Sequence, residues 1–317
     1  MYKRQVNNNL FTNLMAAENL RLAADAVDRV RVESPSDHHR VVELTGLTDD
    51  EVARWRLAAE RMYIPYDEAA GVHLQDDSFL QQAPWDFAGT PPEHYPLLLH
   101  YHPLVIYRHQ VIKQADVVLA TVLLPDRFTA DERQRIFEYY DPLTTGDSSL
   151  SESVQSIAAA DAGKYRTAEE YLLDAVAVDM ADTAGNLRDG VHVASAGGAW
   201  MAAVYGFAGY RWRTRGPEFA PILPTRVRRV RFPLMLHGSA LEVDVEEHQV
   251  TYRLKSGEPV TAHHYGHAFT VSADEPVIFP GQYRTSDAAP EPDGTDAETI
   301  GPTTEDQTED QPCTTST

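Results

Sequence analysis

One stretch of the sequence combines side chains and backbone suited to binding an anion. Residues 189–200 read DGVHVASAGGAW, which places His192, Ser195, Gly197 and Gly198 at the expected start of a helix of small apolar residues. The first N–H groups of a helix lack partners within the helix and favour negative charge, and glycine lets that charge come close. The histidine adds a further donor. The structural alternative is that the glycines permit close helix packing and that His192 pairs within the fold.

A second candidate lies in a long apolar run that polar residues interrupt. The run PLLLHYHPLVIYRHQVIKQADVVLATVLL, residues 96–124, is hydrophobic nearly all round, which is typical of a buried helix. Buried Lys, Gln and Asp side chains need polar partners. Lys113 and Gln114 offer donors and an acceptor that suit sugar hydroxyls. The structural alternative is an ion pair between Lys113 and Asp116, at helical i, i+3 spacing.

A loop rich in hydroxyl groups forms the third candidate. The segment YDPLTTGDSSLSES, residues 140–153, leads into the expected helix SVQSIAAADAG. Ser148, Ser149 and Ser151 either present their hydroxyls to an oxyanion or cap that helix. The sequence lacks the G-x-S-x-G motif of serine hydrolases and the glycine patterns G-x-x-x-x-G-K-[ST] and G-x-G-x-x-G. The sequence therefore gives no support for a serine hydrolase or for an enzyme that uses ATP or NAD.

Histidines and cysteine give no pattern of a metal centre. The clustered histidines are His100 with His102, and His263 with His264 and His267. Neither cluster falls in an H-E-x-x-H helix or has a C-x-x-C beside it. The single cysteine, Cys313, provides neither a disulfide framework nor a thiolate cluster. We therefore expect no metal and no cofactor.

Charge and length narrow the class of protein. The chain has 317 residues, 43% of them hydrophobic, and a net charge of −21, which argues against partners such as nucleic acid or a membrane surface. No stretch approaches the ~20 apolar residues of a membrane helix, and no signal-peptide core follows the start, so we expect a cytoplasmic protein. From Ser286 onward there are nine acidic residues and no Lys or Arg, leaving −12 for the rest. Residues 285–317 are therefore predicted to be a disordered acidic tail.

The expected elements divide the remaining chain in two. Residues 9–27 have helical apolar spacing, and three capping-box patterns predict helix starts: Thr48 with Glu51, Thr129 with Glu132, and Thr167 with Glu170. After residue 213 the segments RVRRVRFPL, ALEVDVEE, QVTYRL and AFTVSA are short, β-branched and alternating. Helices followed by strands indicate a mainly α protein with a helical domain, residues 1–215, and a small antiparallel β-sandwich domain, residues 216–284.

Four blocks of the sequence, in one order, resemble glycoside hydrolase family 65. They are VNNNLFTNLMA, LLLHYHPLVIYRHQVIKQADVVLA, TTGDSSLS and GNLRDGVHVASAGGAWMAAVYGFAGYR. The resemblance is to the maltose, kojibiose and trehalose phosphorylase branch, over the C-terminal part only. It implies the later helices of an (α/α)6 barrel, followed by the family's C-terminal β module.

The chemistry that this resemblance implies is an inverting phosphorolysis. Inorganic phosphate attacks the anomeric carbon of an α-linked glucose disaccharide, giving β-glucose 1-phosphate and glucose, while a carboxylic acid protonates the leaving oxygen. By motif position, Lys113 and Gln114 hold the glucosyl unit. The implied phosphate-binding residues are Ser148, Ser149, His192, Ser195, Gly197 and Gly198. Members of the family are commonly dimers, so the resemblance also implies a homodimer of the full-length enzyme.

The sequence departs from the family pattern at two places. Gly146 stands where the family usually has a histidine before the DSSLS block. The family's general acid is a glutamate a few residues upstream of the VNNN block, and residues 1–5 read MYKRQ. The general acid is therefore expected upstream of Met1, and we predict that the 317-residue chain is an inactive fragment.

Two other functions remain open at this stage. A hydrolase of the same family needs a second carboxylate to activate water, for which Asp147 and Glu152 are candidates. A non-catalytic sugar-binding protein is the alternative if the chain is complete.

Overall fold

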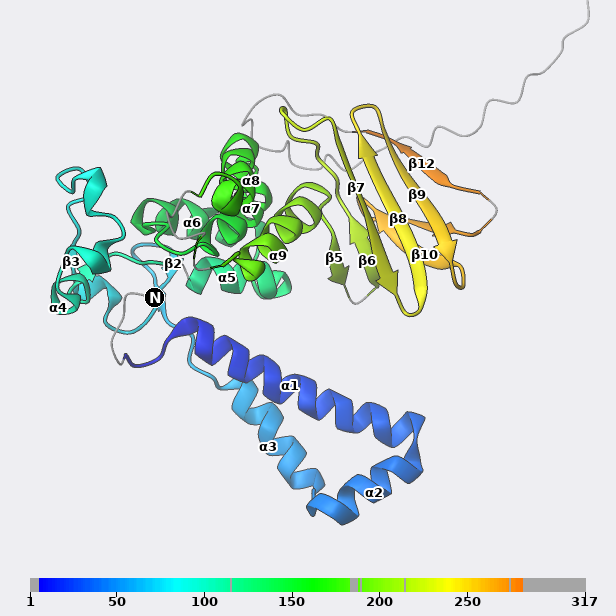
Figure 1. Ribbon diagram of the computed structural model, residues 1–317. Helices are drawn as coiled ribbons and strands as arrows, with labels where there is room; N and C mark the ends of the chain where they lie inside the picture. The colour runs from blue at the N-terminus through cyan, green and yellow to red at the C-terminus, as the bar shows by residue number, and fades with distance from the viewer. Residues whose placement is uncertain are drawn as a thin grey trace, which may run out of the picture.

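The structure is helical in its first two thirds and β in the remainder (Figure 1). The computed structural model describes residues 6–114, 116–182, 188, 190–213, 215–273 and 275–281. The predicted order, helices and then strands, is therefore confirmed. The predicted boundary at residue 215 separates β5 (Arg211–Arg213) from β6 (Gly216–Phe219), although the two strands pair antiparallel and belong to one sheet. The predicted tail, residues 285–317, lies outside the described residues.

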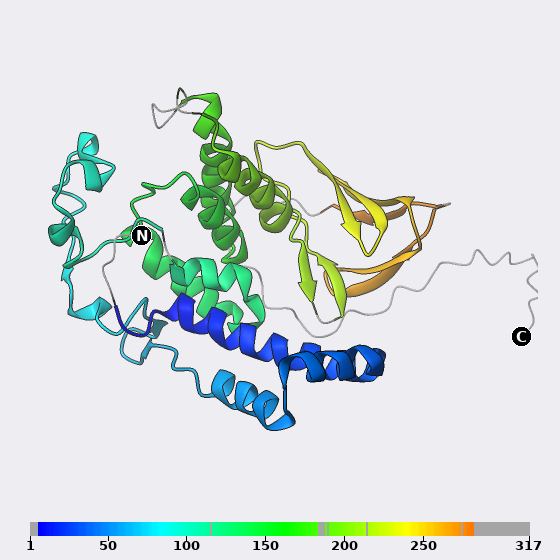
Figure 2. The same ribbon diagram turned by 60° about the horizontal axis from the view of Figure 1, so that its bottom comes forward.

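The first helices form an arm that projects from the rest of the helical part. They are α1 (Leu10–Glu33), α2 (Pro35–Thr45) and α3 (Asp49–Glu60). Asn9 caps α1, because its side chain accepts the N–H of Thr12 at 3.0 Å. In both ribbon views α1 begins beside α5 (Asp116–Leu123) and runs away from it (Figures 1 and 2).

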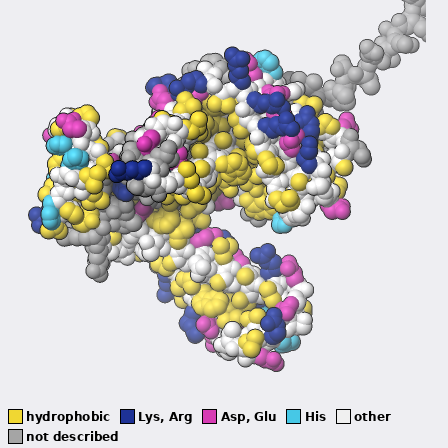
Figure 3. All heavy atoms as spheres, viewed as in Figure 1, with side chains coloured by type: hydrophobic (Ala, Val, Ile, Leu, Met, Phe, Trp, Pro, Cys, Tyr) yellow, Lys and Arg dark blue, Asp and Glu magenta, His cyan; other side chains and the backbone are white. Residues whose placement is uncertain are grey.

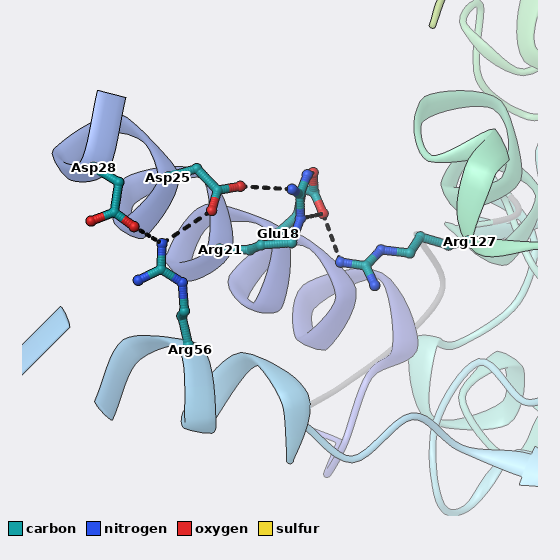
Figure 4. Close-up of polar contacts among 6 residues, drawn as sticks. All are labelled: Glu18, Arg21, Asp25, Asp28, Arg56 and Arg127. Carbon is teal, nitrogen blue, oxygen red and sulfur yellow. Dashed lines mark hydrogen bonds and ion pairs between the residues drawn. The ribbon is translucent and has the colours of Figure 1, made fainter. Parts of the chain in front are cut away.

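Ion pairs hold the arm together (Figure 4). Arg56 of α3 reaches Asp25 at 3.3 Å and Asp28 at 2.6 Å on α1. Glu18 of α1 pairs with Arg21 on the same helix and with Arg127, at 3.0 Å, in the turn after α5. Arg56, Asp25 and Asp28 are 36–50% exposed, so each of their ion pairs adds little stability.

The remaining helices pack around one apolar core. They are α6 (Ala130–Tyr140), α7 (Ser151–Asp161), α8 (Tyr165–Met180) and α9 (Val193–Met201), which continues into a π-helical turn, Ala202–Phe207. The core includes Leu10, Val118, Ile136 and Ile157. Because these residues come from α1, α5, α6 and α7, the helices share a single core.

Two of the three predicted capping signals mark helix starts. Thr129 and Glu132 form a complete capping box on α6, and Thr48 caps α3 by accepting the N–H of Glu51 at 3.2 Å. The prediction for Thr167 is wrong, because α8 begins at Tyr165. Gly163, with φ +73°, turns the chain directly after α7, so the next helix starts before the threonine is reached.

The predicted helix over residues 96–124 is also wrong. The segment forms a 3₁₀ turn, Leu97–Leu99, then α4 (Pro103–Ile106), β4 (His109–Gln110) and finally α5. Pro103 removes a backbone donor and disfavours helical backbone at the preceding residue, so only a new helix starts there. β4 pairs with β3 (Ala83–Pro84), and β1 (Tyr66–Asp67) pairs with β2 (Val72–His73).

The β part consists of two four-stranded sheets, ordered β11-β10-β6-β5 and β12-β9-β8-β7. Its other strands are β7 (Arg229–Leu236), β8 (Ser239–Glu246), β9 (Gln249–Ser256), β10 (Val260–His264), β11 (His267–Val271) and β12 (Val277–Pro280). Phe219 and Ala262 of one sheet share a buried cluster with Val243 and Tyr252 of the other. This matches the predicted small antiparallel sandwich, except that β6 and β10 pair parallel.

The outer face of β7, β8 and β9 is charged. Figure 3 shows Lys and Arg side chains gathered over this sheet. Arg229 binds the buried Asp244 through two nitrogens at 2.7 and 2.6 Å, and Arg231 reaches Glu242 at 2.9 Å. Cross-strand ion pairs of this kind keep the outer face of the sheet in water while its inner face packs on the core. Among the described residues, none of the helices is long and apolar enough to cross a membrane.

Candidate functional site

Helices α7 and α9 run side by side in the same direction. A Cβ atom added to Gly198 would lie 2.3 Å from Ser153 Oγ, and one added to Gly206 would lie 3.6 Å from Ile157 Cα. The residue numbers of these contacts increase along both helices, from Ser153 with Gly198 to Ile157 with Gly206. The helices are therefore parallel, and their N-terminal ends lie at the same end of the pair. Both sets of unpaired N–H groups therefore face one region.

Two further helices begin in the same region. Ser151, the first residue of α7, donates its hydroxyl to the carbonyl of Lys113 at 3.1 Å, shortly before α5 begins. Asn9, which caps α1, lies 3.4 Å from the carboxylate of Asp116, the first residue of α5. The starts of α1, α5, α7 and α9 thus meet, and each of the four sequence blocks singled out above supplies one of them.

Ser148 and Ser149 lie in the loop before α7 and are partly buried. Leu150 occupies the N-cap position and makes no side-chain cap. The hydroxyl of Ser148 accepts the N–H of Leu150 at 3.5 Å, at the limit of a hydrogen bond, while its carbonyl accepts from Ser151 at 2.9 Å. The capping interpretation therefore accounts for little of this serine cluster.

Lys113 and Gln114 lie beside this loop. The neighbouring Ile112 exchanges backbone hydrogen bonds with Leu143 and Thr145, each at 2.9 Å. Gln114, with Asp116 and Gln155, lines a cavity of about 50 Å³. The described ion pairs include none between Lys113 and Asp116, so the structural alternative for Lys113 is not confirmed.

His192 occupies the N-cap position of α9 and is held by an acidic side chain. Its Nδ1 lies 2.7 Å from Asp179 Oδ1, and its backbone N–H donates to Asp179 Oδ2 at 2.8 Å. The hydrogen bond from His192 holds the pKa of Asp179 below its usual range. Both side chains remain about a quarter exposed, at 24% each. The sequence prediction did not include Asp179.

Ser195, Gly197 and Gly198 lie on the first turns of α9 in different surroundings. Ser195 is 1% exposed, and neither its hydroxyl nor that of Ser153 has a hydrogen-bond partner in the part of the chain that the structure describes. Gly198 packs on Ser153, as close helix packing requires. Gly197 faces open space, so packing does not explain the second glycine.

The acidic candidate Asp147 lies in the same loop, and Glu152 lies in the first turn of α7. Asp147 accepts the backbone N–H of Leu97 at 2.8 Å, and burial raises the pKa of its carboxyl. Burial also raises the pKa of Glu152, whose Oε2 is without a partner among the described residues. Gly146 has a left-handed backbone, with φ +68°, which residues other than glycine adopt only with strain. This conformation accounts for a glycine where the family usually has a histidine.

The histidine clusters lie on other elements than the four helix starts. His263 and His264 belong to β10 and His267 begins β11, while His102 caps α4. Across the described ranges, no group of three or more His, Cys, Asp and Glu side chains is placed to hold a metal ion. The expectation of no metal and no cofactor stays a prediction.

Comparison with known proteins places these features in a family. Residues 1–201 match the model of the glycosyl hydrolase family 65 central catalytic domain, and residues 210–271 match that of the family's C-terminal domain. The chain is 44% identical to an α,α-trehalose phosphorylase of Geobacillus stearothermophilus, over 86% of this chain and 36% of that protein. It is 32% identical to a maltose phosphorylase of Bacillus subtilis, over 89% and 35%.

A solved structure gives the same result. A candidate kojibiose phosphorylase from the human microbiome superposes with a TM-score of 0.78 at 26% identity, covering 88% of this chain and 38% of that one. The chain spans about a third of the length of the curated relatives it matches, in their C-terminal part. The match to both domain models shows that the chain belongs to glycosyl hydrolase family 65.

Proposed function

We propose that the chain is the later part of an inverting glycoside phosphorylase, with the later helices of an (α/α)6 barrel. The relatives named above include trehalose and maltose phosphorylases, which motivates the reaction class. The single observation that carries the proposal is the meeting of the starts of α7 and α9, with the hydroxyls of Ser148 and Ser149 before one and His192 before the other. Such a concentration of donors suits phosphate.

In this proposal, inorganic phosphate is the nucleophile. Ser148 and Ser149 donate from the loop, His192 from the cap of α9, and the N–H groups of the first turn of α9 point at the same anion. The buried hydroxyl of Ser195 and the exposed backbone of Gly197 are the remaining groups that bind phosphate. Gly198 contributes by letting α9 approach α7.

The sugar lies on the side of Lys113 and Gln114. Phosphate attacks the anomeric carbon from the face opposite the departing sugar, so configuration inverts and β-glucose 1-phosphate forms. The leaving oxygen takes a proton from a carboxylic acid, the role that the family resemblance gives to a glutamate. Identity to the trehalose phosphorylases, 44% and 37%, exceeds that to the maltose phosphorylase, 32%, so trehalose is the first substrate to test.

The first test compares the purified chain with a longer protein in which a relative's upstream part precedes residue 6. The chain alone is expected to release no glucose 1-phosphate from trehalose, maltose or kojibiose, and the longer protein is expected to release it from one of them. Release of glucose without phosphate by the longer protein would establish the hydrolase instead.

The second test addresses the phosphate site. In the longer protein, His192→Ala is expected to raise the KM for phosphate about tenfold, because a charge-assisted hydrogen bond contributes about 1.5–3 kcal/mol. Its KM for the disaccharide should change far less. An unchanged phosphate KM would remove His192 from the site.

A further inference from the structure

Asp179 stands where a helix disfavours a carboxylate. It is the penultimate residue of α8, and the last turn of a helix carries the negative end of the dipole, where basic side chains are favoured. That turn contains no basic residue to offset the charge. A carboxylate in this place is therefore stabilised from another element.

The stabilising group is His192, which lies directly before α9. One oxygen of Asp179 accepts the backbone N–H of His192 at 2.8 Å, and the other lies 2.7 Å from Nδ1 of the ring. One carboxylate thus fixes both the backbone at the start of α9 and the orientation of the imidazole. Both residues are only partly exposed, so the contact is shielded from solvent on most sides.

We propose that Asp179 is a positioning residue for phosphate binding, a role that rests on the proposed function: it keeps the His192 proton on Nδ1 and thereby turns Nε2 toward the anion. An ionised carboxylate only accepts hydrogen bonds, so the ring nitrogen facing it carries the hydrogen. With Nδ1 engaged, a phosphate oxygen meets the ring at Nε2. When the ring carries both hydrogens, its Nε2–H donates a charge-assisted hydrogen bond to phosphate.

The test uses the whole 317-residue chain and inorganic phosphate. ¹⁵N NMR of the imidazole rings, with the His192 signal assigned from His192→Gln, is expected to show the hydrogen on Nδ1 in the neutral ring. Asp179→Asn keeps the size of the side chain and is expected to weaken phosphate binding about tenfold by calorimetry, the low end of the loss seen when the partner that orients a metal-binding histidine is removed. Asp179→Glu, which keeps the carboxylate, should recover part of that loss.

A matched control separates positioning from charge. Glu170 lies on the same helix, at the surface, in an ion pair with Arg166 at 3.2 Å. Glu170→Gln removes the same charge and is expected to bind phosphate as the unchanged chain does. Equal weakening by Glu170→Gln would overturn the proposal, because a general charge effect would then suffice.

Other results also decide the matter. A wild-type ring with its hydrogen on Nε2 would overturn the proposal without any variant, even if Asp179→Asn failed to fold. Unchanged phosphate affinity in a folded Asp179→Asn chain would overturn this inference alone. Absence of phosphate binding by the wild-type chain would instead contradict the proposed function.

Discussion

At the scale of single residues, burial keeps the ring of His264 neutral. His264 is 6% exposed, its Nδ1 lies 2.9 Å from the hydroxyl of Tyr252, and its ring stacks on Phe279 with the centroids 4.2 Å apart. Burial, helped by the nearby His267, lowers the pKa of His264 to about 4. The folded chain therefore holds this ring uncharged at pH values where an unfolded chain protonates it.

This difference makes stability depend on pH. The pKa of His264 lies below the unfolded value of about 6.5, so its contribution is fully present above that pH and is lost as pH falls toward about 4. The loss amounts to at most about 3 kcal/mol in the free energy of unfolding. Denaturant unfolding measured between pH 7.5 and 4.5 should show this loss. The double variant His264→Phe/Tyr252→Phe should show a smaller dependence of the unfolding free energy on pH.

The exposed His248 provides the control for this prediction. Its side chain is 89% exposed, so His248→Gln should leave the pH dependence unchanged. If the double variant kept the full slope of the original chain, His264 would not be its source.

Asp179 shows what sequence reasoning omits at this scale. The residue types at His192, Ser195 and Ser148 pointed toward anion binding, and the family resemblance supplied their roles. The pairing of Asp179 with His192 joins two helices across 13 positions, so no local motif announces it. The available signal was an acidic residue in the last turn of a helix, where the dipole disfavours it.

At the scale of elements, α9 has neighbouring glycines with opposite surroundings. Gly198 faces Ser153 of α7, whose Oγ leaves no space for a Cβ, whereas Gly197 has nothing within 4 Å. Glycine within a helix lowers the free energy of unfolding by about 0.5–1 kcal/mol relative to alanine. At position 198 the lack of space for a Cβ atom outweighs this cost.

Alanine substitutions should therefore act in opposite directions. Gly198→Ala is expected to lower the free energy of unfolding by about 1–3 kcal/mol, because α7 and α9 must move apart. Gly197→Ala is expected to raise it by about 0.5–1 kcal/mol. Urea unfolding of the two variants measures both effects, and changes of the same sign would contradict this description of the helix pair.

Some elements could be predicted and others could not. The start of α9 and the capping box of α6 follow from local residue types. The run over residues 96–124 was misjudged because apolar content alone does not distinguish a helix from buried turns, and Pro103 interrupts it. The pairing of β4 with β3 depends on residues 26 positions apart, which periodicity does not report.

At the scale of the whole molecule, several ion pairs join the helical and β parts, and the one made by Arg211 has the most buried arginine among them. Arg211 of β5 is 7% exposed. It donates hydrogen bonds of 2.7 Å to both carboxylate oxygens of Asp161, the last residue of α7. It also donates to the carbonyls of Tyr205 and Tyr210 at 2.6 and 2.8 Å. Apolar contacts run through the same junction, since Val204 shares the core of the sheets.

Removing this arginine should destabilise the whole chain. Arg211→Met is expected to cost about 3–5 kcal/mol, because it leaves a shielded carboxylate and two carbonyls without their donor. Arg231→Met removes a half-exposed arginine that pairs with Glu242 and should cost no more than about 1 kcal/mol. Similar losses in chemical unfolding of the two variants would show that the junction does not depend on Arg211.

The overall order of helices and strands was predictable from composition and periodicity, but the convergence of the starts of α1, α5, α7 and α9 was not. That convergence depends on contacts such as Asn9 with Asp116, across 107 positions, and Ser153 with Gly198. The sequence blocks showed which segments matter, and packing in three dimensions determines that they meet.

For the proposed phosphate site, the seam of small residues between α7 and α9 bears on selectivity among anions. Ser153 and Gly198 set the spacing of the two helices, and that spacing sets how far the Ser148–Ser149 loop lies from His192. A side chain one methyl larger in the seam would widen the gap without touching a single donor. Discrimination between phosphate and a bulkier tetrahedral oxyanion such as arsenate would then be adjustable from inside the helix pair, by substitutions that never contact the anion.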